Sequence, residues 1–154
     1  MSGKRIAIID IETNALLEDM VDFSFFPYKL KPTAKLWCVV ITDYHTGVSE
    51  TAELNQITKD WMKKTLEPYS VAFLHNGHKF DLISLKLFGV LDYKIGWLGE
   101  KDSCFGREFQ FYDSLVLSRL FDPNRFGGHS LKAWGQRTGE FKDDYRKQCI
   151  WQVS

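Results

Sequence analysis

Short apolar runs alternate with polar, turn-forming stretches along this chain, and their lengths predict both strands and helices. Two of the runs, residues 6–9 and 71–74, are wholly apolar, which is typical of strands that are buried on both faces. Turn residues at 43–47 are expected to join two antiparallel strands into a hairpin. The predicted strands are residues 6–9, 36–42, 48–52, 71–74 and 109–113.

Apolar residues at spacings of three and four predict helices between and after these strands. One helix is expected to be capped by Asn55 and to end at Pro68, and another follows residue 81 and is closed by Gly89. Residues 114–121 and 129–137 are predicted as the last two helices. Because strands and helices alternate in the second half, the order predicts an α/β domain with a mixed β-sheet flanked by helices.

Residues 14–32 interrupt this pattern with an irregular stretch that is rich in aromatic residues, including Phe23, Phe25, Phe26 and Tyr28. Two interpretations are open for these aromatic side chains. Packing into the core is the commoner fate of aromatic residues and is expected here. The alternative is that the stretch covers a channel for DNA.

Composition and length predict one folded domain over residues 1–154. Hydrophobic residues make up 44% and charged residues 26% of the 154 residues, which is typical of a globular protein and excludes long disorder. The 20 Lys and Arg balance the 20 Asp and Glu, so no overall positive field would attract nucleic acid from a distance. Any DNA binding is therefore expected to be local or assisted by metal ions.

The compartment is predicted from what the chain lacks. No apolar run approaches the ~20 residues that cross a bilayer, and residues 1–5 do not resemble a signal peptide. Cys38, Cys104 and Cys149 are widely spaced and form no C-x-x-C pair, so neither a disulfide framework nor a zinc site is expected. These features predict a cytoplasmic protein without a membrane partner.

Carboxylates follow two of the predicted strands. Asp10 and Glu12 are two residues apart, so on a strand they share a face and repel each other unless a cation lies between them. Hard divalent ions such as Mg²⁺ prefer such oxygen ligands, although a lone pair of this kind is also common at a solvated strand end. Asp81 follows another strand, where it is either a further ligand or a helix N-cap. Asn76 and Phe80, on either side of the flexible Gly77, suit contact with a nucleotide.

Taken together, these motifs resemble a known family. Asp10-x-Glu12 followed by Asn76-x-x-x-Phe80-Asp81 is similar to the first two motifs of the proofreading 3'-to-5' exonucleases of the DEDD superfamily. Residues 10–18, 75–81, 113–120 and 125–135 resemble, in the same order, the exonuclease domain of family A DNA polymerases from T-seven-type bacteriophages. The resemblance implies an RNase H-like fold and hydrolysis of phosphodiester bonds at DNA 3' ends, as part of phage DNA replication and proofreading.

The resemblance also implies roles for individual residues. Two ions of Mg²⁺ or Mn²⁺ would be held by Asp10, Glu12 and Asp81, with Asp10 bridging both. Asn76 would hydrogen-bond the penultimate nucleotide and Phe80 would stack on a sugar or base. Leu16 or Leu17 would lie beside the terminal base; ordinary packing in the core is the alternative and is expected slightly more often for such residues. The expected substrate is the 3' end of single-stranded DNA, although the metal motifs themselves do not distinguish DNA from RNA.

One motif of the family is missing from this sequence. The fourth carboxylate of these exonucleases lies in a Tyr-x-x-x-Asp or His-x-x-x-Asp motif, and neither pattern occurs here; the residue four after Tyr145 is Cys149. The chain is therefore expected to be an exonuclease domain that lacks its C-terminal part and the polymerase domain. Two hypotheses follow. The chain is an active exonuclease, either alone or completed by a separate polymerase polypeptide, or it is an incomplete exonuclease-like remnant that binds DNA ends or a partner without cleaving.

Overall fold

The computed structural model describes residues 3–140 and groups the chain into two compact units, Met1–Asp113 and Ser114–Ser154. Each unit is described by itself below. That residues 1–154 form one domain stays a prediction. Tyr145 and Cys149, the positions at which the sequence departs from the Tyr-x-x-x-Asp motif, lie outside the described residues.

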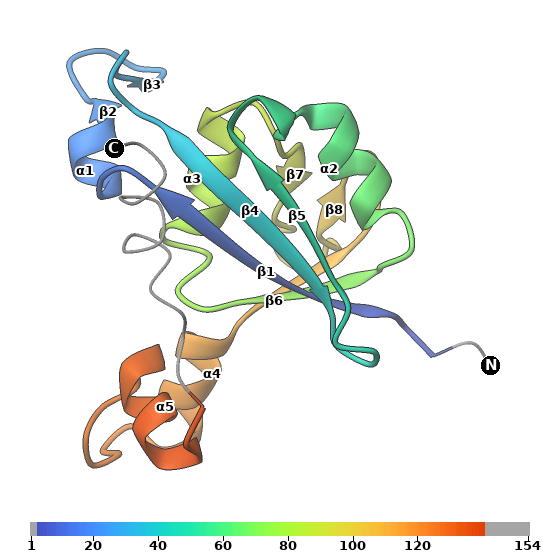
Figure 1. The fold of residues 1–154 in the computed structure, drawn as a ribbon, viewed down its shortest axis with the longest axis vertical. Coiled ribbons are helices and arrows are strands. Elements are labelled where there is room, and N and C mark those ends of the chain that lie inside the picture. The colour runs from blue at the N-terminus through green and yellow to red at the C-terminus, as the bar shows by residue number, and fades with distance from the viewer. Residues whose placement is uncertain (1–2, 141–154) are drawn as a thin grey trace. The chain divides into compact units, whose positions relative to one another are not determined.

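A five-stranded mixed sheet forms the first unit (Figure 1). Its strand order is β10-β6-β1-β4-β5. The central strand β1 pairs in parallel with β6 and antiparallel with β4, β10 is parallel to β6, and β5 is antiparallel to β4. This arrangement confirms the predicted mixed sheet. The bounds are β1 Ile6–Thr13, β4 Leu36–Asp43, β5 Ser49–Glu53, β6 Val71–Leu74 and β10 Gln110–Asp113.

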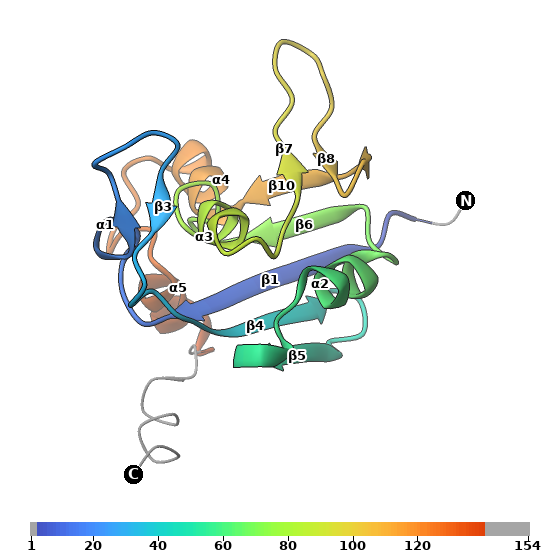
Figure 2. The same cartoon turned by 90° about the horizontal axis from the view of Figure 1, so that it is seen from above.

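Two helices, α2 (Lys59–Leu66) and α3 (Asp81–Leu87), cover one face of this sheet (Figure 2). The apolar side chains that β1 and β4 direct to this face form one buried cluster with those of the two helices. Complete burial of a Val, Leu, Ile or Met side chain stabilises the folded state by roughly 1.5–3 kcal/mol. This apolar layer therefore holds the two helices against the sheet. Its members include Ala7, Ile9, Ile11, Val39, Ile41, Met62, Leu66, Leu82 and Leu85.

The start of α2 differs from the sequence prediction. Residues 54–56 form the short 3-10 helix η1 (Leu54–Gln56), and α2 begins at Lys59 with Thr58 as its N-cap. The Thr58 hydroxyl accepts a hydrogen bond from the Trp61 N–H at 3.1 Å. The prediction that Asn55 caps this helix was therefore wrong, because a threonine three residues later satisfies the first free N–H groups.

Several short elements were not predicted from the sequence. After β1 the chain forms α1 (Leu17–Met20), β2 (Val21–Asp22) and β3 (Lys29–Leu30), and the last two pair as a small separate sheet. A three-stranded sheet, in the order β7-β8-β9, lies between α3 and β10 in the sequence. Its strands are β7 Tyr93–Lys94, β8 Ser103–Cys104 and β9 Arg107–Glu108.

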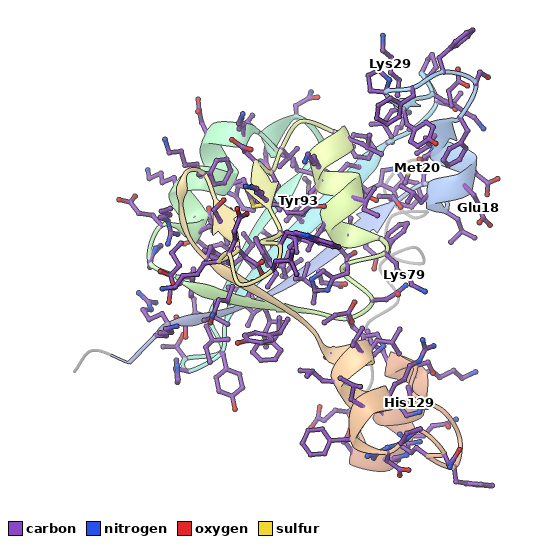
Figure 3. All side chains as sticks on the ribbon, turned by 180° about the vertical axis from the view of Figure 1, so that it is seen from behind. Glu18, Met20, Lys29, Lys79, Tyr93 and His129 are labelled. Carbon is purple, nitrogen blue, oxygen red and sulfur yellow. The ribbon has the colours of Figure 1, made fainter. Side chains whose placement is uncertain are left out.

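The described part of the second unit is a pair of helices, α4 (Ser114–Phe121) and α5 (Leu131–Thr138), which confirms both predicted helices. Ser130 caps the start of α5, and Gly139 ends it with a φ of 78°. The Ser118 hydroxyl joins the helices through the ring of His129, labelled in Figure 3, at 2.7 Å and the Trp134 indole N–H at 3.2 Å. Nowhere in residues 3–140 is a helix both long and apolar enough to cross a bilayer.

Candidate functional site

Asp10 and Glu12 lie within β1, close to its end. The sequence predicts an apolar strand over residues 6–9 that delivers the two acids at its C-terminal end, and the observed strand runs through both acids to Thr13. Along it, Ile9 and Ile11 are buried against α2 and α3, whereas Asp10 and Glu12 are only partly buried and point to the opposite face. The prediction that the two acids share a face, with Ile11 on the other, is confirmed.

The neighbouring strand β4 places uncharged residues beside these acids. Asp10 is paired with Val40, and Glu12 with Cys38. The register shifts between Glu12 and Thr13, which is where β1 leaves its regular pairing. Irregularities of this kind redirect side chains and are common beside active sites.

Asp81 is the first residue of α3 and is only 5% exposed. The N-cap position is occupied by Phe80, which makes no side-chain cap bond, so the alternative that Asp81 is the N-cap was wrong. Strand β6, which leads to Asp81 through the loop of residues 75–80, runs parallel to β1, and their pairing ends at Ile8 and Phe73. Parallel strands end at the same edge of a sheet, so Asp10, Glu12 and this loop belong to one edge.

The loop of residues 75–80 has a constrained backbone. Asn76 adopts a left-handed conformation with a φ of 62°, which asparagine tolerates better than most residues. Gly77 is buried, and a Cβ atom on it would lie 2.3 Å from the Cβ of Leu74. The sequence predicts that this glycine makes the loop flexible, but the structure shows that the position needs a residue without a side chain.

Asp113, at the end of β10, fixes this loop from the other side. Its carboxylate is buried and accepts hydrogen bonds from the Asn76 N–H at 2.9 Å and the His78 N–H at 3.2 Å. The Nδ1 atom of His78 lies 3.7 Å from the same carboxylate. No spacing in the sequence links Asp113 to residues 37 and 35 positions earlier. The link is a consequence of β10 being the parallel neighbour of β6.

The residues expected to touch DNA have different surroundings. Leu16 is 57% exposed, so the alternative that it packs in the core was wrong. Phe80 is partly buried and packs against the core cluster, while Asn76 is partly buried in the loop. The aromatic residues between β2 and β3 are exposed, which contradicts the expectation that they pack inward.

The chemistry of the three acids suits divalent cations, because anionic oxygen atoms are the ligands that Mg²⁺ and Mn²⁺ prefer. Within residues 3–140, however, the side chains as placed form no group of three or more His, Cys, Asp or Glu that could hold a metal ion. The structure brings the elements that carry the acids to one edge of the sheet. Metal binding by Asp10, Glu12 and Asp81 stays a proposal.

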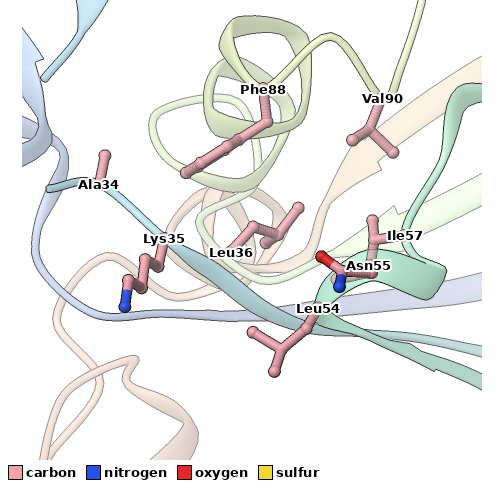
Figure 4. Close-up of a pocket in the computed structure, with 8 residues that line it drawn as sticks. All are labelled: Ala34, Lys35, Leu36, Leu54, Asn55, Ile57, Phe88 and Val90. Carbon is pink, nitrogen blue, oxygen red and sulfur yellow. The ribbon is translucent and has the colours of Figure 1, made fainter. Parts of the chain in front are cut away.

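A pocket of about 410 Å³ opens in the first unit, between the start of β4, η1 and the end of α3 (Figure 4). Its walls include Leu36, Leu54 and Phe88, with Lys35 and Asn55 as the polar residues. None of the three acids lines it. The pocket is therefore lined by other residues than the predicted metal ligands, although its lining residue Leu36 pairs with Thr13 at the end of β1.

Comparison with known proteins agrees with the sequence motifs. No protein-family model matches the chain. It is 30% identical to the DNA-directed DNA polymerase of Escherichia phage T7, in an alignment covering 90% of this chain. This chain is related to the phage T7-type DNA polymerases. The polymerase of Enterobacteria phage T3 is 28% identical over the same share of the chain. The chain spans about a fifth of the length of these two phage T7-type polymerases.

A solved structure supports the fold independently of the phage T7-type polymerases. The family B DNA polymerase from the archaeon Pyrobaculum calidifontis matches 90% of this chain with a TM-score of 0.58 and 16% sequence identity. At this identity the likeness concerns the fold alone. The five-stranded mixed sheet with flanking helices is the RNase H-like fold, as predicted.

Proposed function

We propose that this chain is a 3'-to-5' exonuclease domain that hydrolyses phosphodiester bonds at DNA 3' ends with two divalent metal ions. The observation that carries this proposal is the placement of Asp10, Glu12 and Asp81. Two of them lie on one face at the end of the central strand, and the third follows the parallel neighbour of that strand. Similarity to phage T7-type DNA polymerases over 90% of the chain supports DNA as the substrate.

The charge of the acids favours metal-dependent chemistry. A DNA phosphodiester is an anion, so three carboxylates at one edge of the sheet would repel it unless cations lay between them. Divalent ions, when bound, activate a water molecule and offset the charge that grows on the phosphate in the transition state. Asp10 and Glu12 would hold these ions on the sheet face, and the buried Asp81 would hold them from the start of α3.

The loop of residues 75–80 would position the DNA 3' end. Its backbone is fixed by the close approach of Gly77 to Leu74 and by the two hydrogen bonds to Asp113. Asn76 and Phe80 are partly buried in this fixed loop, so an amide and a ring would meet the terminal nucleotides at little cost in conformational entropy. Leu16, exposed just beyond β1, would contact the terminal base.

The test is digestion of 5'-labelled single-stranded DNA by the purified chain in Mg²⁺ or Mn²⁺. We expect a ladder of products that shortens from the 3' end. Asp10→Ala and Asp81→Ala should each reduce the rate by at least about a hundredfold, because each removes a proposed metal ligand. Asp60→Ala, which removes an exposed carboxylate from α2, is the matched control and should keep the wild-type rate.

Two outcomes would contradict the proposal. If the wild-type chain binds DNA ends or a polymerase polypeptide but does not cleave, the alternative of an incomplete exonuclease-like protein is correct. If it cleaves and Asp10→Ala cleaves equally well, the acids of β1 are not the catalytic residues. Parallel digestion of an RNA of the same sequence shows whether the sugar matters.

A further inference from the structure

The segment that joins β2 to β3 exposes four aromatic side chains within six residues. Phe25 and Phe26 are 81% and 85% exposed, and Phe23 and Tyr28 are 55% and 48% exposed. Single exposed aromatic residues are ordinary, but several together make an apolar patch of the kind that marks an interaction site. We call Phe23, Phe25, Phe26 and Tyr28 the aromatic surface.

Contacts within the aromatic surface hold three of the rings in place. Tyr28 meets Phe23 edge-on with ring centroids 5.1 Å apart, and meets Phe26 edge-on at 5.5 Å. The Asp22 carboxylate accepts a hydrogen bond from the Ser24 N–H at 2.9 Å and so stabilises the turn between them. A ligand that stacks on these rings would meet side chains that are already ordered, which lowers the entropic cost of binding.

Hydrogen bonds attach the aromatic surface to the end of β1, the strand that carries Asp10 and Glu12. The Lys31 N–H donates to the Met20 carbonyl at 2.7 Å, and Met20 is buried. Asn14, the residue after β1, donates from its side chain to the Thr33 carbonyl and accepts from the Lys35 N–H, both at 2.8 Å. The surface therefore lies at the end of the sheet where β1 terminates (Figure 1).

Lysines lie on one side of the aromatic surface. Lys29, Lys31 and Lys35 follow it in the sequence, whereas Glu18, Asp19 and Asp22 precede it, so residues 14–35 carry no net charge. All three lysines are exposed, and Figure 3 shows Lys29 pointing outward. Proteins bind single-stranded nucleic acids by combining aromatic rings, on which bases stack, with cationic side chains, which contact the phosphates.

We propose that the aromatic surface, with Lys29 and Lys31, binds single-stranded DNA. Bases would stack on the exposed rings while the two ammonium groups contact phosphates. The direction of the strand, with its 3' end leading to Asp10 and Glu12, rests on the proposed exonuclease function. Binding itself does not depend on cleavage and can be measured without it.

The experiment is fluorescence anisotropy of a labelled oligonucleotide of about 12 thymidines, long enough for a site of this kind, in EDTA so that no cleavage occurs. Phe25→Ala/Phe26→Ala should weaken binding by about tenfold or more, because the loss of even one base–aromatic stacking contact lowers the affinity by about that factor. Lys29→Gln/Lys31→Gln should reduce the slope of log Kd against log salt by about 1.4, because two phosphate contacts are lost.

Matched controls lie away from the aromatic surface. Tyr44→Ala removes an aromatic ring that is 60% exposed in the turn between β4 and β5, and Lys63→Gln/Lys64→Gln removes two exposed lysines of α2. Both controls should bind DNA as the wild type does. The inference is overturned if the wild type does not bind the oligonucleotide, if Phe25→Ala/Phe26→Ala binds equally well, or if Tyr44→Ala loses as much affinity.

Cleavage in Mg²⁺, measured in parallel, separates this inference from the proposed function. If the wild type binds through the aromatic surface but does not cleave, the inference stands and the exonuclease proposal fails. If the wild type cleaves and Phe25→Ala/Phe26→Ala cleaves and binds as well as the wild type, the exonuclease proposal stands and the inference fails.

Discussion

Asp113 and Asp43 are two buried aspartates, and each stabilises a turn or loop of the backbone. Each carboxylate accepts hydrogen bonds from two backbone N–H groups of a following or neighbouring turn. Asp113 holds the loop of residues 75–80, whereas Asp43 holds the turn between β4 and β5 and is paired with Ala7 near the start of β1. A charged acceptor contributes roughly 1.5–3 kcal/mol to stability, so both residues matter for folding. Only Asp113 is expected to matter for the site.

Replacing Asp113 by Asn should loosen the loop that carries Asn76 and Phe80. One acceptor oxygen becomes an N–H donor that faces a backbone N–H, so about 2 kcal/mol of stability should be lost. Hydrogen exchange at the Asn76 and His78 amides should become faster than in the wild type. Asp43→Asn should cost a similar free energy of unfolding while leaving these two amides protected. Unchanged exchange in Asp113→Asn would show that the carboxylate does not hold the loop.

Asp43 should also make the stability of the protein depend on acid pH. Hydrogen bonds from Arg5 and from the backbone of Thr46 and His45 hold the pKa of Asp43 far below its usual value. A folded-state pKa below the unfolded one of about 3.9 means that this stabilisation is complete above that pH. It is lost as the pH falls through the folded-state pKa.

The comparison of wild type and Asp43→Asn isolates this effect. We expect the variant to be less stable at neutral pH and the difference in the free energy of unfolding to shrink below about pH 4. Urea unfolding at a series of pH values measures it. A difference that stays constant down to acid pH would mean that the carboxylate charge is not involved.

At the scale of the elements, α2 offers a direct comparison of two candidate caps. The structure assigns the cap to Thr58, and Asn55 lies exposed in η1. Thr58→Ala should therefore lower the free energy of unfolding by about 1 kcal/mol, and Asn55→Ala by much less. Chemical denaturation of the two variants decides between them, and a larger loss in Asn55→Ala would contradict the described start of α2.

The sequence predicted the elements that have a clear period and missed those that have none. The central strands and the helices after residues 81 and 113 carry enough apolar residues for their pattern to show. Strands of two residues, such as β2 and β8, have no repeat to detect, since only one residue faces each side. In β1 only residues 6–9 form an unbroken apolar run, because Asp10 and Glu12 replace apolar residues on the face away from the core.

The candidate site was predictable only in part for a related reason. Asp10, Glu12 and Asp81 were predicted because they occupy the acidic positions of the two motifs, Asp10-x-Glu12 and Asn76-x-x-x-Phe80-Asp81. The hydrogen bonds of Asp113 to the loop of residues 75–80, and those of Asn14 that attach the aromatic surface to β1, depend on which strands become neighbours. Local sequence does not determine that. The aromatic residues were expected in the core because their composition is apolar, but a short hairpin anchored by backbone hydrogen bonds leaves them exposed.

At the scale of the whole molecule, the acids at one edge of the sheet should link folding to metal binding. Ions that bind the folded chain and not the unfolded one raise its melting temperature. Millimolar Mg²⁺ or Mn²⁺ should therefore raise the melting temperature of the wild type, and Asp10→Ala should remove the increase. If wild type and Asp10→Ala melt alike with and without metal, the acids do not form a metal site.

The exonuclease proposal is tested most directly by the end from which DNA is shortened. The measurement is a time course with 5'-labelled single-stranded DNA, compared with the same oligonucleotide carrying an inverted 3'-terminal nucleotide, in Mg²⁺ and in EDTA. The proposal predicts stepwise shortening of the normal strand in Mg²⁺ only, with the inverted end resistant. Equal cleavage of both strands, or cleavage in EDTA, would contradict a metal-dependent activity that starts at the 3' end.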